Sequence, residues 1–102
     1  DPVIHPLVRR HPITKKPSLF LSPHTMVKIV DYDYEKGREL LEKLTKHSIQ
    51  PKYVYEHIWN NDDIVMWDNR CTMHSVKPFD NNIIKRIMHR VTLVGDKEPL
   101  MA

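Results

Sequence analysis

The sequence predicts a small, mainly β domain with one or two helices. Short apolar segments separated by prolines occupy the first part of the chain, as expected for edge strands. After Pro51, apolar and polar side chains alternate with a period of two, which is typical of strands. Only residues 34–47 have helical spacing.

Length and composition set the broad class. A chain of 102 residues with 40% hydrophobic residues fits one domain. No apolar run approaches the roughly 18 residues of a membrane span, so we expect no membrane partner. The net charge of +3 is modest, and we expect no nucleic-acid partner. Cys71 is the single cysteine, which favours a cytoplasmic protein. The chain begins at Asp1 without an initiator methionine or a signal peptide, so we expect that it was cut or processed.

The first strands form a predicted hairpin. Residues 7–10 and 18–21 are its two strands, and residues 13–16 are its polar turn. A third short strand is expected at residues 26–30. The predicted helix follows, over residues 34–47.

That helix has a clear start and one apolar face. Asp33 is placed to cap its N-terminus. Leu40, Leu41 and Leu44 share a face, and two Glu–Lys pairs four residues apart support the helix.

Four strands are predicted in the second half. They cover residues 53–59, 64–67, 71–76 and 85–94. Alternation in the last of them divides its side chains between two faces. The apolar side chains expected in the sheet core are Trp67, Ile87, Val91 and Leu93.

The other face of the last strand presents Arg86 and Arg90, four residues or about 13 Å apart. Such a face is either exposed to solvent or lines a cavity for anions, since guanidinium matches carboxylate and sulfonate. His74 lies in the preceding strand, and a lone histidine there is either structural or a metal ligand. Cys71 is expected to be a small buried hydrophobe, because no zinc signature and no neighbouring base accompany it.

Two segments carry a family resemblance. These are Trp67-Asp68-Asn69-Arg70-Cys71-Thr72-Met73-His74 and Arg86-Ile87-Met88-His89-Arg90-Val91-Thr92-Leu93-Val94-Gly95-Asp96. The segments at residues 5–12 and 22–25, near the start of the chain, resemble the same family. The chain closely resembles the taurine / 2,4-dichlorophenoxyacetate (TauD/TfdA) family of Fe(II)- and 2-oxoglutarate-dependent dioxygenases. The resemblance implies that residues 1–102 are the C-terminal portion of a double-stranded β-helix (a cupin-like jelly roll).

The resemblance also implies roles for single residues. His74 matches the distal histidine of the iron site, a 2-His-1-carboxylate triad. Arg86 matches the arginine that binds 2-oxoglutarate, and Arg90 the arginine that meets the anionic head of the substrate. Residues 67–69 would support the iron histidine rather than bind iron. No catalytic residue beyond these ligands is assigned.

The family's triad begins with a His-x-Asp/Glu pair, and none of the seven histidines here is followed by an acid two residues later. The chain therefore has one of three iron ligands. The intact protein is expected to hydroxylate a small anionic substrate with O₂, decarboxylating 2-oxoglutarate to succinate and CO₂. This chain alone is expected to be inactive, and to form a homo-oligomer or pair with the missing N-terminal half. Two alternatives stay open: a non-catalytic structural remnant of the family, and an anion-binding module without iron.

Overall fold

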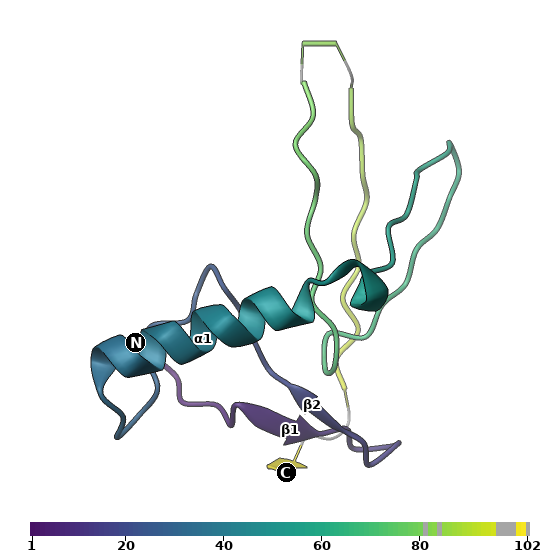
Figure 1. Ribbon diagram of the computed structural model, residues 1–102. Helices are drawn as coiled ribbons and strands as arrows, with labels where there is room; N and C mark the ends of the chain where they lie inside the picture. The colour runs from purple at the N-terminus through teal and green to yellow at the C-terminus, as the bar shows by residue number, and fades with distance from the viewer. Residues whose placement is uncertain (81, 84, 96–99, 102) are drawn as a thin grey trace.

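The computed structural model describes residues 1–80, 82–83, 85–95 and 100–101. The chain forms a short antiparallel sheet with strand order β2-β1-β3 and one long helix, from which extended segments project (Figure 1). In chain order the elements are β1 (Val8–Arg10), β2 (Pro17–Leu19), α1 (Tyr34–Ser48), the 3₁₀ helix η1 (Pro51–Tyr53) and β3 (Leu100–Met101).

The predicted hairpin is confirmed. Strands β1 and β2 are antiparallel, with Val8 opposite Leu19. The turn between them places Lys15 in the left-handed region at φ 64°, and the Lys15 carbonyl accepts a hydrogen bond from Arg10 Nη1 at 2.8 Å. Strand β3 was not predicted; it adds to the free edge of β1, with Met101 opposite Arg9.

The predicted helix is also confirmed. Asp33 precedes it, and its carboxylate accepts the backbone N–H of Lys36 at 3.0 Å, as an N-cap residue does. Helix α1 ends at Ser48, one residue beyond the predicted range. Leu41 is buried and Leu40 is half-buried, so the leucine face is the one that packs against the protein.

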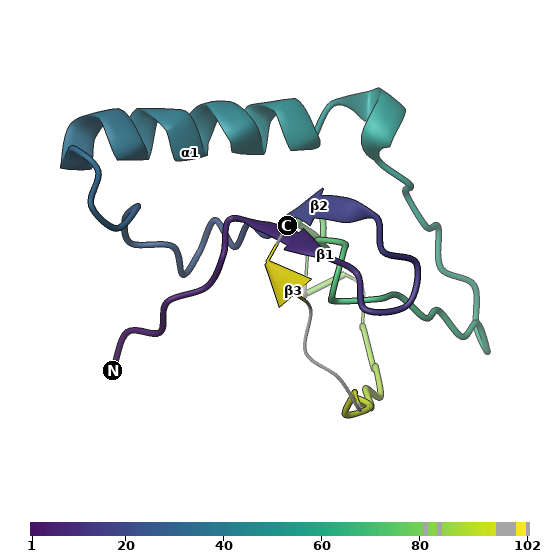
Figure 2. The same cartoon turned by 90° about the horizontal axis from the view of Figure 1, so that it is seen from below.

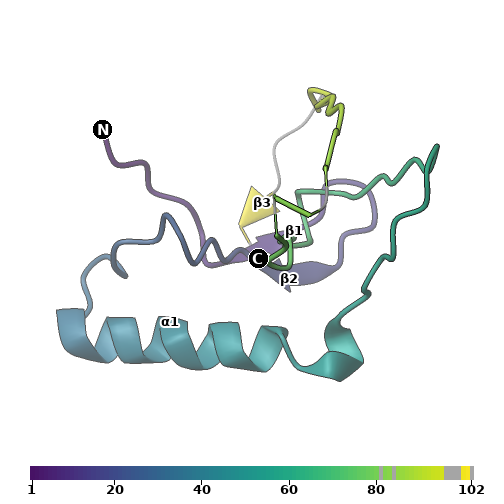
Figure 3. The ribbon, with the colours of Figure 1, turned by 90° about the horizontal axis from the view of Figure 1, so that it is seen from above.

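The connection from β2 to α1 runs alongside the helix in the opposite direction, as Figures 2 and 3 both show. Gly37 is buried at this contact, facing Ile29 and Tyr32. The guanidinium of Arg38 donates to the carbonyls of Met26 and Val27 at 3.0 and 3.2 Å. The predicted strand at residues 26–30 is therefore wrong, because these carbonyls bond to a helix side chain instead of a neighbouring strand.

The core is thin. Leu21 and Leu41 are the buried apolar side chains recorded in the described part of the chain, with exposed fractions of 5% and 4%. His11 is also buried, with an exposed fraction of 7%. No helix that the structure describes is long and apolar enough to cross a membrane.

The four strands predicted after Pro51 are not formed. Residues 53–59, 64–67, 71–76 and 85–94 include no strand in the described ranges, apart from the 3₁₀ turn that ends at Tyr53. Instead they run as two extended arms that leave the body of the molecule (Figure 1). Residues 53–59 and 64–67 form the two legs of the shorter arm, and residues 71–76 and 85–94 lie in those of the longer arm. A strand needs hydrogen-bonded neighbours and a covered face, and an isolated two-stranded ribbon is at best marginal. Sequence alternation specified the extended backbone but supplied no partner strand.

The predicted burial in this half is wrong as well. Trp67 is 40% exposed. The exposed fractions of Ile87, Val91 and Leu93 are 80%, 86% and 84%. Cys71 is exposed rather than buried. Alternation predicts which side chains share a face of a strand, but burial depends on a second layer, and no described residue provides one here.

Candidate functional site

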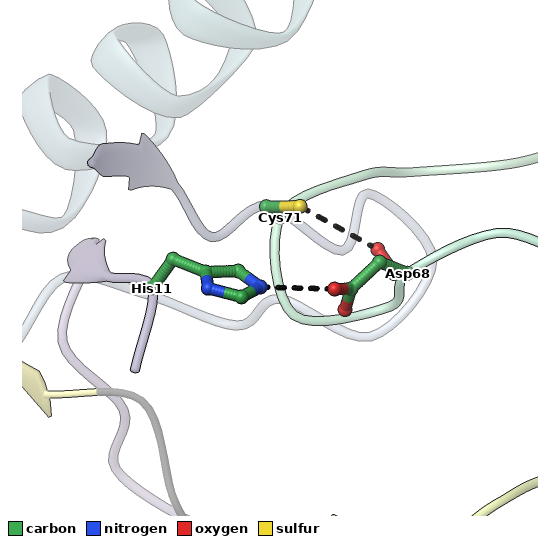
Figure 4. A group of neighbouring side chains, drawn as sticks. All are labelled: His11, Asp68 and Cys71. Atoms are coloured by element: carbon green, nitrogen blue, oxygen red, sulfur yellow. Dashed lines mark hydrogen bonds and ion pairs between the residues drawn. The ribbon is translucent and has the colours of Figure 1, made fainter. Parts of the chain in front are cut away.

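His11 joins the first hairpin to the centre of the chain. It follows β1 directly, and its ring is buried. The backbone N–H groups of Ile13 and Thr14 donate to its Nδ1 at 3.1 and 3.2 Å. Because Nδ1 accepts, the neutral ring carries its proton on Nε2, which donates to Asp68 Oδ2 at 2.9 Å (Figure 4). The turn of the hairpin thus selects the tautomer that can bind Asp68.

Asp68 receives a second and stronger set of donors from Arg70. Arg70 Nε donates to Oδ1 at 2.9 Å and Nη2 to Oδ2 at 2.8 Å, a two-pronged ion pair. The backbone N–H of Arg70 also donates to Oδ1. The Arg70 side chain, followed by His11, holds the pKa of Asp68 well below its ordinary value. Asp68 is therefore ionised across the physiological range.

The backbone of Asp68 closes a tight turn. Its carbonyl accepts the N–H of Thr72 at 3.1 Å and the Thr72 hydroxyl at 2.6 Å. This turn brings Trp67 next to His74, with ring centroids 4.7 Å apart and the planes tilted by 40°. Trp67 Nε1 donates to Asn69 Oδ1 at 2.9 Å, which orients the indole. His11, Asp68 and Arg70 together, named the clasp below, hold the turn that sets Trp67 against His74.

His11, Asp68 and Cys71 have the composition of a metal site, and their ligand atoms lie within 4.8 Å of one another (Figure 4). Their contacts do not fit one. A metal on His11 Nε2 would displace the proton that binds Asp68, while Nδ1 is already an acceptor. Arg70 occupies both oxygens of Asp68. Partial burial of the sulfur and the Asp68 carboxylate raise the pKa of the Cys71 thiol, which keeps it protonated.

His74, the predicted iron ligand, lies on the surface beside Trp67. Neither of its ring nitrogens hydrogen-bonds to a residue that the structure describes, so either one is available to a metal. Within the same residues, His74 belongs to no cluster of three metal-ligating side chains. It fits one position of an iron site, and further ligands would have to come from elsewhere.

Arg86 and Arg90 both lie exposed on the longer arm. The guanidinium carbon of Arg86 is 5.8 Å from the centre of the Phe79 ring, which agrees with the two legs of this arm running side by side in Figure 1. No hydrogen bond or ring contact in the described ranges joins either arginine to His74. Among the described residues, the structure thus shows no direct contact that joins the three predicted site residues.

A second histidine–aspartate pair closes the shorter arm. His57 Nε2 and Asp63 Oδ2 are 3.0 Å apart, and the backbone N–H of Asn60 donates to the same oxygen at 2.9 Å. The Asn60 N–H, then His57, lowers the pKa of Asp63. This pair holds the two legs of the arm together in the absence of a strand ladder.

Sequence reasoning missed the contacts of His11 and Arg70. The Asp-x-Arg spacing at residues 68–70 is a local signal for the ion pair, since both side chains lie on one side of a turn. No local signal points to His11, which is 57 residues from Asp68 in the chain.

Residues 1–92 match the family described as taurine catabolism dioxygenase TauD, TfdA family. The chain belongs to this family. The TauD/TfdA resemblance read from the Trp67–His74 and Arg86–Asp96 motifs is thereby confirmed.

Three curated relatives illustrate the range of the family. The alpha-ketoglutarate-dependent 2,4-dichlorophenoxyacetate dioxygenase of Burkholderia sp. (strain RASC) is 39% identical over 92% of this chain and 31% of its own length. Pentalenolactone F synthase of Streptomyces arenae is 37% identical, covering 91% and 31%. The alpha-ketoglutarate-dependent xanthine dioxygenase of Emericella nidulans is 40% identical, covering 72% and 21%. The chain thus spans less than a third of these relatives, and no solved structure matches it.

Proposed function

We propose that this chain is the C-terminal portion of an Fe(II)- and 2-oxoglutarate-dependent dioxygenase that hydroxylates a small anionic organic substrate. The observation that carries the proposal is the family match over residues 1–92, with relatives named as alpha-ketoglutarate-dependent dioxygenases. Aryloxy acids are the first substrates to test, because two relatives are named for 2,4-dichlorophenoxyacetate and (S)-phenoxypropionate. Sulfonates are the second class.

In this proposal His74 supplies one neutral imidazole to Fe(II). A ring nitrogen without a hydrogen bond to a described residue supports the assignment, because a ligating ring needs one free nitrogen. The contact with Trp67 restricts the orientation of the ring. When bound, the iron would supply O₂ activation coupled to decarboxylation of 2-oxoglutarate. The remaining ligands belong to a His-x-Asp/Glu segment outside these residues.

Arg86 and Arg90 would bind the two anions. Arg86 offers a planar fork for the distal carboxylate of 2-oxoglutarate, and Arg90 offers one for the anionic head of the substrate. Both guanidiniums are exposed, so each is free to receive a carboxylate or sulfonate. Their contribution is to place the two small molecules beside the metal ligand.

The exposed arms support the fragment part of the proposal. Large apolar side chains line both arms, among them Tyr55, Ile58, Ile64, Met66, Ile83, Ile87, Val91 and Leu93. Unpaired extended backbone with exposed apolar side chains favours association with further strands. We propose that a preceding segment of a longer chain covers these arms and completes a jelly roll; a second copy of the chain is the alternative partner.

Succinate formation by the full-length protein tests the function. The protein is incubated with Fe(II), 2-oxoglutarate and panels of aryloxy acids and sulfonates. His74→Ala is expected to abolish turnover, whereas His89→Ala, at an exposed histidine on the same arm, is the matched control. The 102 residues alone should bind iron weakly and produce no succinate; stoichiometric iron and succinate from them would refute the fragment proposal.

Substitution of each arginine by lysine tests the two anion sites. Arg86→Lys should raise the KM for 2-oxoglutarate far more than the KM for the substrate, because an ammonium cannot reproduce a two-pronged contact. Arg90→Lys should do the reverse. If both variants change only the substrate KM, the two assignments are wrong. If the protein binds 2-oxoglutarate equally well with and without Fe(II), the result would favour an anion-binding module. If the full-length protein shows no turnover, the result would favour a structural remnant of the family.

A further inference from the structure

We propose that His11 and Asp68 are positioning residues for His74, acting through the turn that carries Trp67. This inference rests on the proposed role of His74 as an iron ligand. It concerns residues far apart in the chain, and neither of them is proposed to touch iron.

The first step is the anchor. His11 is 7% exposed, and its orientation is set by two backbone N–H groups of the hairpin turn, at Ile13 and Thr14. A ring held at Nδ1 by its own hairpin presents Nε2–H in a fixed direction. Asp68 lies at that position, 2.9 Å away.

The second step is the turn itself. Arg70 and His11 satisfy the Asp68 carboxylate from two sides, so the side chain cannot rotate without breaking charge-assisted hydrogen bonds. The Asp68 carbonyl at the same time accepts the N–H and the hydroxyl of Thr72. The conformation of the turn is thus tied to the hairpin.

The third step is the contact between Trp67 and the proposed iron ligand His74. Trp67 immediately precedes Asp68, and its ring lies 4.7 Å from that of His74. The His74 ring has no hydrogen bond to a described residue, and the indole is the ring contact that the structure shows for it. Trp67 is itself 40% exposed, and the described residues do not enclose it in a core. Its position therefore depends on the clasp.

The test compares His11→Leu, which removes the donor to Asp68, with His11→Gln, whose amide N–H can replace it. His24→Leu, at an exposed histidine, is the control. Removal of a group that orients a metal ligand typically weakens metal binding 10–100-fold. In the full-length protein, His11→Leu should raise the Fe(II) Kd by about tenfold or more, with His11→Gln and the control within about threefold of wild type.

A metal-free measurement separates this inference from the proposed function. Full-length protein labelled with ¹³C at the histidine rings is examined by NMR, and the His74 signal is assigned from a His74→Gln variant. In the wild type, the nearby indole should shift the NMR resonances of the His74 ring protons away from their usual positions. His11→Leu should remove that change in chemical shift. His11→Gln should restore it.

The outcomes are distinct. An unchanged His74 signal and an unchanged Fe(II) Kd in His11→Leu would overturn the positioning role, even in an active enzyme. A displaced signal that depends on His11, in a protein that does not bind Fe(II), would refute the proposed function but support the contact pathway. If His11→Leu does not fold, Asp68→Asn replaces it, and it must shift the same His74 signal for the inference to stand.

Discussion

Truncation of Leu41 to alanine is expected to destabilise the chain more than truncation of any other side chain on helix α1. Leu41 is 4% exposed, and it and Leu21 are the buried apolar side chains in the described part of the chain. The change removes three carbon atoms, worth about 2.4 kcal/mol of transfer free energy at roughly 0.8 kcal/mol each. Leucine-to-alanine changes in cores cost about 2–5 kcal/mol, and a thin core that can collapse around the gap favours the lower half of that range. Alanine is a good helix former, so the helix itself loses nothing.

Urea unfolding followed by far-UV circular dichroism measures this cost. We expect the free energy of unfolding to fall by about 2–3 kcal/mol, which for a chain of this size lowers Tm by roughly 10–20 °C. Lys43→Ala is the matched control, because Lys43 is exposed on the same helix and its loss should change stability by less than about 0.5 kcal/mol. A Leu41→Ala cost below about 1 kcal/mol, or equal to that of the control, would show that this face of the helix does not pack against the protein.

Three further changes test the local structure. Gly37→Ala should raise the stability by up to about 1 kcal/mol in thermal melts, because a Cβ there meets Tyr32 and Ile29 carbon atoms at 3.4 and 3.6 Å, which are ordinary contacts; a lower Tm would reveal a clash. Asp33→Ala should cost about 1 kcal/mol of unfolding free energy, with Asp33→Asn retaining most of it as an acceptor; equal losses in both would exclude the cap. The pKa of Asp68 is lowered from 3.8, so its contribution to stability is full above that pH and is lost as the pH falls through the folded-state pKa. Between pH 5 and 2, the free energy of unfolding should therefore fall less steeply with decreasing pH in Asp68→Asn than in wild type. Identical slopes in the two proteins would contradict the ion pair.

The local elements could be predicted because their causes are local. Proline spacing and apolar pairs specified the hairpin, and a capping aspartate followed by leucines at helical spacing specified α1. The family motifs named His74, Arg86 and Arg90 as candidates, and the family itself is confirmed. Period-two alternation, by contrast, indicated strands that the chain does not form.

Other features depend on distant partners and became visible only in the folded chain. The pairing of His11 with Asp68 joins residues 57 positions apart, and no local pattern distinguishes a buried anchor histidine from an exposed one. The same holds for Trp67 and Ile87, whose exposure depends on whether another layer covers them. Backbone preference and helix capping could be read from the chain alone, because these are properties of neighbouring residues. Burial, strand pairing and the orientation of His74 against Trp67 were decided by contacts between segments, because each needs a partner that chain-local chemistry does not name.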